Sequence, residues 1–454
     1  MRKFILSLFI LSFTYKGQSQ IDYLRYNDNF NYLKSDGLVR KGTENLKFIP
    51  FGNQCNISVG GEVREQLQYY CNPNFGDLPS GTASNSPRHW HRAMAHANIE
   101  IGKTTRIFTQ LSSTFRFFSP IPATPEIEEN HLSLHQLFVD YQFNKNWMIR
   151  LGRQEIGYGS HRLLTFREGP NTRLAFDAAI VRHSSEKRKV DILVLTPVVS
   201  KKGAFDDETF KDIIAGIYST EKILPEKLNA DWYFMHFESQ RRTYNYQKGM
   251  DSRHITGVRL FSQSNTVNYE VEMTYQFGKF NTQWVKAYGI IADVNLLLIR
   301  RAKAVVGIAG NYVSGDKNRN DNLLNTYNPL FSKPQYGLTA PIGISNIVTI
   351  SPYFRASPAS KYHIYGGAYF MRRQSNQDGV YTPNGTQARP KPEKLFYSTE
   401  KKLGTLLSLE TNYSPSKHIS LAVDVSHFFA GPFIEQTGQG KDITYLSFKA
   451  GYKF

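Results

Sequence analysis

The last twelve residues, Ile443 to Phe454, read ITYLSFKAGYKF and alternate apolar with polar side chains up to a terminal aromatic residue. Successive side chains of a β-strand point to opposite faces of the sheet, so this segment would have one apolar and one polar face. The apolar face would carry Leu446, Phe448, Ala450, Tyr452 and Phe454, and the polar face Ser447, Lys449, Gly451 and Lys453. Such a strand is typical of a wall that separates lipid from water.

The N-terminus predicts export from the cytoplasm. Met1, Arg2 and Lys3 form a short basic region, residues 4–15 are an apolar run, and residues 17–19 supply small and polar side chains at a cleavage point. We therefore predict that residues 1–19 are a signal peptide. A retained membrane anchor is the alternative, but the apolar run is shorter than the roughly 20 residues that span a membrane.

The composition argues against a helical membrane protein. The 454 residues are 14% aromatic with a mean hydropathy of −0.43, and no segment after residue 19 approaches the apolar length of a membrane helix. A closed β-barrel also crosses lipid, because its strands pair every backbone N–H and C=O group. We predict an all-β chain that forms a single transmembrane antiparallel β-barrel in the outer membrane of a Gram-negative bacterium. Its C-terminal strand resembles the signal that the barrel-assembly machinery recognises.

Alternating segments separated by turns continue along the whole chain after the signal peptide. The predicted strands are 56–70, 91–102, 105–118, 131–143, 146–156, 174–183, 189–198, 212–222, 229–239, 251–262, 266–277, 284–292, 296–312, 345–357, 361–373, 405–413, 419–429 and 443–454. Because bacterial barrels usually have an even number of strands, we predict about 18, with 16 as the alternative.

The organisation follows from these strands. Residues 51–454 would form the barrel, and residues 20–50 a periplasmic lead-in. The longest connections, which we expect to be extracellular, are 71–90, 119–130, 314–344 and 374–404. Cys55 and Cys71 lie near the two ends of the first strand, too far apart for a disulfide unless a turn intervenes.

Charge narrows the class of solute. Removing Arg2, Lys3 and Lys16 with the signal peptide leaves 52 Lys and Arg against 38 Asp and Glu, a net charge of +14. This excess attracts polyanions. An exported barrel does not meet nucleic acid, so the expected partners are outer-membrane lipid and an anionic saccharide or solute.

The densest polar block runs from Arg150 to Arg182. Arginine binds carboxylates through two hydrogen bonds and stays charged, and an unpaired arginine that faces lipid is costly. We expect a substrate path along the lumen, lined by Arg64, Arg92, Arg116, Arg150, Arg153, Arg162, Arg167, Glu168, Arg173, Asp177, Arg182 and Arg259. Strict alternation would place Arg150 and Arg153 on opposite faces, and a bulge at Gly152 would remove that conflict.

Five stretches resemble the alginate-export porin family. They are FIPFG (48–52) with ISVGGEVREQLQYY (57–70), HRAMAHANIEIGKTTRIFTQLSS (91–113), LSLHQLFVDYQF (132–143), GRQEIGYGSHRLLTFREGPNTRLAFDAA (152–179) and HFFAGPFIEQTGQGKDITYLSFKAGYKF (427–454). The resemblance implies an outer-membrane barrel of eighteen strands with an electropositive lumen that passes an anionic polyuronate. It also implies lumen roles for Arg153, Arg162, Arg167, Arg173 and Asp177.

Other functions remain open at this point. The arginine block could instead cross-link the wall through Glu155, Glu168 and Asp177, and both roles could coexist. A closed barrel that acts as a polyanion-binding receptor or adhesin is the alternative to a porin. We expect no enzyme, cofactor or metal, because His131 and His135 share one face of a predicted strand without a completing ligand pattern and no nucleophile or nucleotide motif occurs.

Overall fold

The computed structural model describes residues 24–28, 30, 33, 40, 42–118, 128–209, 212–339, 341–389 and 398–454, so the predicted signal peptide lies outside the described residues. The long strands are β2 (Cys55–Cys71), β3 (Asn85–Ile101), β4 (Thr105–Phe117), β5 (Asn130–Gln142), β6 (Trp147–Gln154), β7 (Phe176–Ser184), β8 (Arg188–Pro197), β9 (Asp212–Leu224), β10 (Leu228–Tyr244), β11 (Gln247–Phe261), β12 (Val267–Phe280), β13 (Gln283–Ile299), β14 (Ala304–Val313), β16 (Ile347–Ala356), β17 (Tyr362–Arg372), β18 (Lys402–Tyr413), β19 (Ile419–Ala430) and β20 (Ile443–Lys453). Two-residue strands β1 (Ile49–Pro50) and β15 (Leu323–Leu324) and the short helices η1 (Arg25–Asn27), η3 (Gly42–Leu46), η4 (Pro73–Gly76) and α1 (Pro432–Gln436) complete the described elements.

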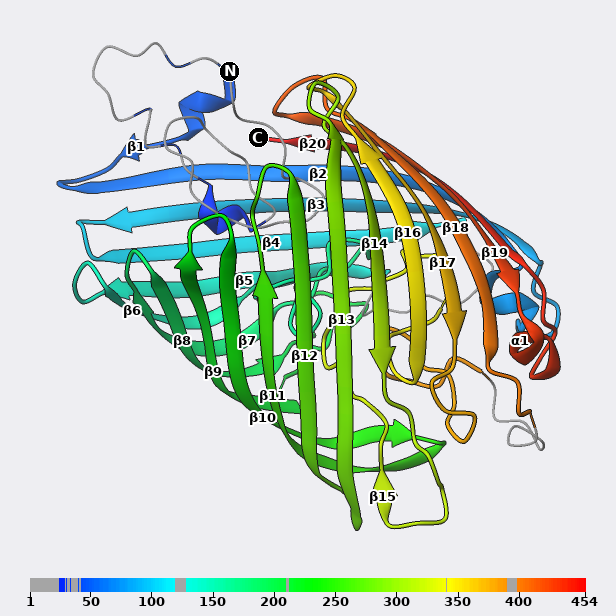
Figure 1. Ribbon diagram of the computed structural model, residues 1–454. Coiled ribbons are helices and arrows are strands. Elements are labelled where there is room, and N and C mark those ends of the chain that lie inside the picture. The colour runs from blue at the N-terminus through cyan, green and yellow to red at the C-terminus, as the bar shows by residue number, and fades with distance from the viewer. Residues whose placement is uncertain are drawn as a thin grey trace.

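The eighteen long strands form a closed antiparallel barrel. Each pairs with its neighbour in the chain, and β20 pairs with β2, with Tyr452 opposite Val63. The ribbon follows this order around the wall, and the C-terminus ends beside β2 (Figure 1). The predicted fold class and strand number are therefore confirmed. Cys55 and Cys71 lie at opposite ends of one continuous strand, which keeps them apart. No helix of the described chain is long and apolar enough to cross a membrane.

The predicted strand boundaries are wrong at several places. β3 begins at Asn85, inside the predicted connection 71–90, and β10 extends to Tyr244, beyond the predicted end at 239. The predicted break between strands 284–292 and 296–312 is also misplaced, because β13 continues to Ile299 and the turn lies at residues 300–303. Asp293 and Asn295 alternate with the exposed Val294 and Leu296, so they occupy the inward face of an unbroken strand. Polar residues at inward positions continue a barrel strand instead of ending it.

The wall has the two faces that the alternation predicts. In β20, Leu446, Phe448 and Tyr452 are exposed on the outside, whereas Ser447 is buried on the inside. In β12, Met273 and Tyr275 are likewise exposed and Glu272 and Gln276 are buried. Lipid would contact only the exposed apolar side chains. The two-residue repeat of each strand therefore produces an apolar belt on the outside of the barrel and a polar lining on its inside.

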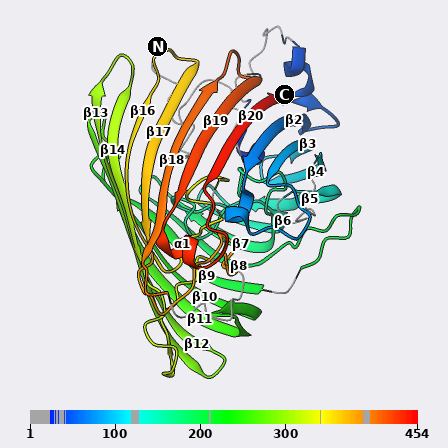
Figure 2. The ribbon, with the colours of Figure 1, turned by 90° about the vertical axis from the view of Figure 1, so that its right-hand side faces the viewer.

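The two ends of the barrel differ. Short turns such as 102–104 and 225–227 join strands at the end where β20 finishes, and the longer connections lie at the opposite end. Figures 1 and 2 show that α1 and the longer connections lie at the end of β18 to β20 away from the C-terminus. Because bacterial barrels place short turns in the periplasm and long loops outside the cell, we expect the long connections of this chain to be extracellular.

Two of the long connections fold against the inner face of the wall. The amide of Phe331 donates to the carbonyl of Leu163 at 3.0 Å, and the amide of Lys333 donates to that of His161 at 3.0 Å, so segments 155–175 and 314–346 run together. Their apolar side chains pack on inward side chains of β7 to β11, in a cluster of Ile156, Leu163, Leu164, Phe176, Ile180, Leu193, Leu195, Ile214, Tyr218, Tyr233, Met235, Phe237, Ile255, Leu330 and Phe331. The inside of the barrel therefore holds folded protein of its own.

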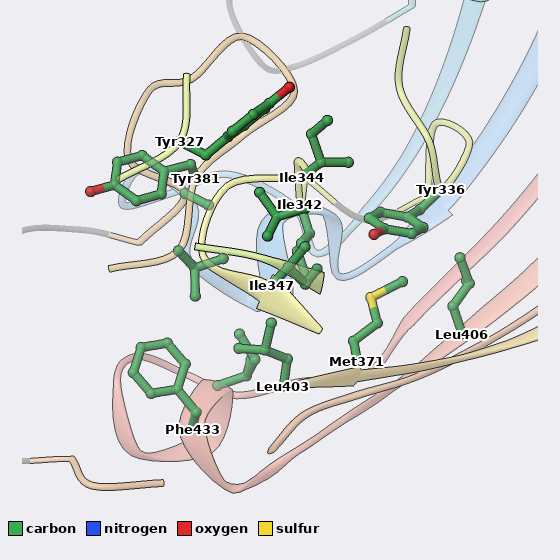
Figure 3. Packing of buried hydrophobic residues seen from close by; sticks show 14 of the residues in the cluster. Tyr327, Tyr336, Ile342, Ile344, Ile347, Met371, Tyr381, Leu403, Leu406 and Phe433 are labelled. Carbon is green, nitrogen blue, oxygen red and sulfur yellow. The ribbon is translucent and has the colours of Figure 1, made fainter. Parts of the chain in front are cut away.

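A second apolar cluster joins the long connections to strands β13 to β20. Figure 3 shows Tyr327, Ile342 and Ile344 of segment 314–346 above Met371 and Leu403. The cluster also includes Leu406 and, from α1, Phe433. Burial of this apolar surface stabilises the connections against the barrel rim.

A buried carboxyl pair ties two of these connections together. Asp378 Oδ2 accepts hydrogen bonds from the amide of Asp316 at 2.7 Å and from the hydroxyl of Thr326 at 2.6 Å, and Asp378 Oδ1 accepts from the hydroxyl of Tyr381 at 2.6 Å. Burial, reinforced by the charge of Asp378, raises the pKa of Asp316 to about 7. The folded loops therefore favour protonated Asp316.

We predict that the face pattern of β12 can be read by cysteine labelling in a C55S/C71S background. Asn268→Cys should react with a charged, water-soluble maleimide from the lumen, whereas Met273→Cys should react only with a lipid-soluble reagent, because the two residues lie on opposite faces. Equal reactivity of the two positions towards both reagents would contradict a membrane wall at β12.

We predict that the connection 314–346 loosens as pH rises. Because the folded pKa of Asp316 lies above the ordinary value of 3.8, its stabilising contribution is complete below pH 3.8 and is lost as pH rises through about 7. Tryptic cleavage at Lys317 or Arg319, normalised to a peptide substrate at each pH, should accelerate between pH 5 and 7 and level off above pH 7. In Asp316→Asn this acceleration should be reduced, with a remainder that comes from Asp378, whose pKa is also raised by burial; an identical profile in both proteins would contradict the assignment.

Candidate functional site

Three arginines converge on Glu168, which lies in the inward segment between β6 and β7. Arg92 of β3 places Nη2 2.5 Å from Glu168 Oε1 and 2.7 Å from Glu62 Oε1. Arg64 of β2 donates to the main-chain carbonyl of Glu168 at 3.0 Å, and Arg173 Nε lies 3.3 Å from Glu168 Oε2. The Glu168 side chain is 30% exposed and those of Arg92 and Arg173 are 1% exposed, so solvent reaches the cluster mainly through the carboxylate.

Glu155, directly after β6, extends this cluster from Arg173 to His135 of β5. Arg173 Nε and Nη2 lie 2.8 and 2.9 Å from its two carboxylate oxygens, and His135 Nε2 lies 2.7 Å from Oε1. All three side chains are buried. Glu155 is held by a bidentate arginine and an imidazole, so its charge is balanced and its lone pairs accept hydrogen bonds. An ion pair can be buried with a small desolvation penalty only under these conditions.

A second set of ion pairs lies towards the short-turn end, beside the N-terminal helix η1. Arg150 Nε and Nη2 lie 2.6 and 3.0 Å from the two oxygens of Asp140, which also pairs with Arg106. The ring of Tyr26 stacks beneath the Arg150 guanidinium at 4.4 Å, and the Tyr26 carbonyl accepts a hydrogen bond from Arg106 at 2.7 Å. The segment that precedes the barrel therefore contacts its inner wall.

Two further inward arginines of the wall, Arg182 and Arg259, are also paired with carboxylates. Arg182 binds both oxygens of Asp191 at 2.7 Å. Arg259 lies 2.6 Å from Asp231 and 2.8 Å from Glu270. From the inward segment, Arg162 reaches Glu270 at 2.5 Å, so Glu270 joins wall to segment as Glu168 does.

Arg116, near the end of β4, and Arg167, in the inward segment, contact the long connections. Arg116 Nη1 is 3.2 Å from Glu128 Oε2. Arg167 donates to the carbonyl of Ser332 at 3.1 Å and to the side-chain oxygen of Asn384 at 2.6 Å, so it links three connections. Neither residue lies in the Glu168 cluster.

Arg153 and Asp177 lie on the face opposite to the one we expected. The register is continuous through Gly152, with Arg153 directly opposite Leu137 on one side and Asp177 on the other. Leu137 is exposed on the outside, and directly opposite residues share a face. Arg153 binds both oxygens of Asp177, at 2.8 and 3.0 Å, which neutralises two charges on the outer surface. No bulge turns Arg153 inward.

The His131 and His135 pair is also separated. A register shift in the β4–β5 ladder falls beside His135, and such a shift reverses the alternation. His131 contacts Glu129 and stacks on Phe115, whereas His135 contacts the buried Glu155. No cluster of three or more His, Cys, Asp and Glu side chains suited to a metal ion occurs among the described residues.

Sequence reasoning identified the inward arginines better than their partners. The partners that it did not name are Asp140, Asp191 and Asp231, which all lie on inward positions of the wall. The alternation within each strand could have placed them in the lumen. Which arginine meets which carboxylate depends on strand register and on the path of the inward segment.

We predict that the Arg92 cluster contributes strongly to stability. Arg92→Met leaves Glu62 buried without its main cation, which typically costs about 3–5 kcal/mol. Arg188→Met breaks an exposed pair with Glu221 and should cost under about 1 kcal/mol. Urea unfolding in detergent micelles measures both, and equal effects would contradict the burial argument. Glu62→Gln combined with Arg92→Met should recover part of the loss, because it removes the stranded charge.

Comparison with known proteins supports this architecture. The family model described as alginate export matches residues 55–446. Two solved structures share the fold: OccAB2 of Acinetobacter baumannii, with a TM-score of 0.59 and 9% identity over 87% of this chain and 98% of that one, and OpdO of Pseudomonas aeruginosa, with a TM-score of 0.57 and 9% identity over 88% and 97%. No curated protein matches in sequence. Because the family model spans nearly the whole barrel, the chain belongs to the alginate export family.

Proposed function

We propose that this protein is an outer-membrane porin that passes anionic solutes, an acidic polysaccharide or oligosaccharide such as alginate, along its arginine-bearing inner wall. Its family and its closed barrel support an outer-membrane channel. The observation that carries the choice of solute is the convergence of Arg64, Arg92 and Arg173 on one partly exposed carboxylate, Glu168.

Glu168 holds the place that a uronate carboxylate would take. Arg92 also pairs with Glu62, and Arg173 also pairs with Glu155, so both guanidinium groups keep their positions when Glu168 moves. A solute carboxylate that replaces Glu168 meets guanidinium groups already oriented and largely desolvated, and little reorganisation accompanies the exchange. Because each bound charge replaces one already present, binding stays weak enough for the solute to leave, as conduction requires.

Passage through this barrel needs no covalent chemistry. The inner wall offers ion pairs whose members exchange partners, and the net charge of +14 after removal of the signal peptide attracts the solute to the mouth. Two further partners are proposed. Outer-membrane lipid surrounds the apolar belt, and the barrel-assembly machinery recognises the C-terminal strand.

A closed barrel that acts as a polyanion receptor or adhesin is the second candidate. The observation that favours it is the packing of the connections 155–175 and 314–346 inside the barrel, which fills part of the lumen. Conductance in a planar bilayer separates the two candidates, because a receptor with a filled lumen would carry little current.

We predict that the channel prefers anions and that Glu168 limits its affinity for oligouronates. Glu168→Gln removes the competing carboxylate, so block of the ion current by an oligomannuronate should strengthen by about tenfold, equivalent to about 1.4 kcal/mol. Arg64→Gln should weaken the block and reduce anion preference, and both effects should diminish as salt shortens screening to about 8–10 Å. Reversal potentials in a KCl gradient and single-channel block measure these changes.

Arg153→Gln is the matched control. It removes an arginine of the same sequence block that lies on the outer face with Asp177, so selectivity and block should remain parental. A channel that conducts without anion preference, or in which Arg64→Gln and Glu168→Gln behave as Arg153→Gln does, would show that the arginines only cross-link the wall. Absence of conductance would favour the receptor.

A further inference from the structure

The wall formed by β13 to β20 differs chemically from strands β2 to β12, which carry the paired arginines described above. Two inward rows of directly paired residues cross it, and the first contains Asn295, Gly307, Tyr353, Gly367, Ser408 and Ser426. The second row contains Arg355, Tyr365, Glu410, Asp424 and Ser447. Tyrosine, carboxylate and small polar side chains therefore dominate this part of the lumen.

Glycines allow the tyrosine rings to lie along the wall. Tyr353 of β16 is directly opposite Gly307, and a Cβ at Gly307 would lie 2.4 Å from the ring carbon Cζ of Tyr353, so the ring covers the glycine. Tyr365 packs beside it with ring centroids 5.8 Å apart and planes tilted by 30°. Both side chains are half-buried, so part of each ring remains open to the lumen.

Hydrogen-bonding groups surround these two rings. The hydroxyl of Tyr353 donates to Asp293 Oδ1 at 2.9 Å, and the hydroxyls of Tyr365 and Tyr369 lie 2.6 Å apart. Glu410 is directly opposite Tyr365 on β18 and accepts a hydrogen bond from Asn412 at 2.9 Å. Aromatic faces flanked by carboxylate acceptors match the two faces of a pyranose, whose C–H bonds pack on a ring and whose hydroxyls donate hydrogen bonds.

We propose that Tyr353 and Tyr365 form a subsite for the rings of a saccharide, with Asp293 and Glu410 as acceptors for its hydroxyl groups. The inference rests on the proposed function and deepens it. Arg355 is the one cation of the two rows and is held by Asn295 at 3.1 Å, and Asp424 is paired with Lys449. Asp293 and Glu410 beside the rings favour the hydroxyl-bearing faces of a saccharide over its carboxylates. A uronate chain is thereby oriented, with its ring faces on the tyrosine wall and its carboxylates turned away from it.

The alternative is a purely structural role, in which the tyrosines only rigidify the wall by covering glycines. Tyr353 has such a role through Gly307, so Tyr353→Ala alone would be ambiguous. Tyr365 gives a cleaner test, because its atoms nearest to a Cβ at Gly367 would be its hydroxyl oxygen at 3.0 Å and Cζ at 3.5 Å, so its ring covers the glycine less closely than Tyr353 covers Gly307. Tyr362 of the same strand is the matched control, since it is exposed on the outside and stacks on Tyr413.

The experiment measures single-channel block by two probes of equal length, an oligomannuronate and the same oligomer with its carboxyl groups reduced to alcohols. Tyr365→Ala should weaken block by both probes about tenfold, because it removes a stacking face. Tyr365→Phe keeps the face and should retain most of the affinity, and Tyr362→Ala should change nothing. The reversal potential in a KCl gradient should be parental in all three variants.

The outcomes separate this inference from the proposed function. If oligomannuronate blocks the parental channel and Tyr365→Ala, shown by heat-modifiable mobility to be folded, is blocked equally well by both probes, the tyrosine subsite is wrong while the anionic channel stands. If the reduced probe blocks in a Tyr365-dependent manner and the channel shows no anion preference, the subsite stands and the anionic solute is wrong. Block that weakens in Tyr365→Phe as much as in Tyr365→Ala would assign the effect to the hydroxyl network and overturn the stacking role.

Discussion

The structure depends on one constraint, the pairing of every backbone amide and carbonyl group of a wall that lipid surrounds. The seam between the first and last strands is where a sheet would otherwise expose an edge. At this seam Gly61 and Phe454 exchange hydrogen bonds at 3.1 and 3.0 Å, and the buried Arg25 donates to the carbonyl oxygens of both residues. A side chain from the N-terminal segment therefore caps the point at which the chain closes on itself.

Closure creates the second constraint, because the inward face of the wall carries many charges that are sheltered from bulk water. Buried charges persist only when they are paired and hydrogen-bonded. The inward segment between β6 and β7 meets this requirement for the wall: its Glu168 and Arg162 pair with Arg92 and Glu270 of the strands. The same segment buries an apolar cluster against β7 to β11, so apolar packing positions the groups that complete the ion pairs.

The two halves of the lumen have different chemistry as a result. Strands β2 to β12 present arginines held by carboxylates, and strands β13 to β20 present tyrosines over glycines beside Asp293 and Glu410. The two walls therefore offer different groups to the lumen: paired guanidinium groups on one side, and aromatic rings beside carboxylates on the other.

The sequence by itself determined the barrel, its eighteen strands and the inward position of arginines such as Arg64, Arg92 and Arg259, because a strand in a membrane wall repeats every two residues and local alternation is sufficient to read it. Only the tertiary structure decided the rest. It turned segment 155–175 inward to bring Glu168 between Arg92 and Arg173. Arg153 on the outer face and Asp293 within β13 instead obey the plain alternation, which an expected bulge and an expected strand break had obscured. The meeting of Arg92 with Glu168 depends on the packing of residues more than seventy positions apart in the chain, and a pattern with a period of two carries no information about contacts at that distance.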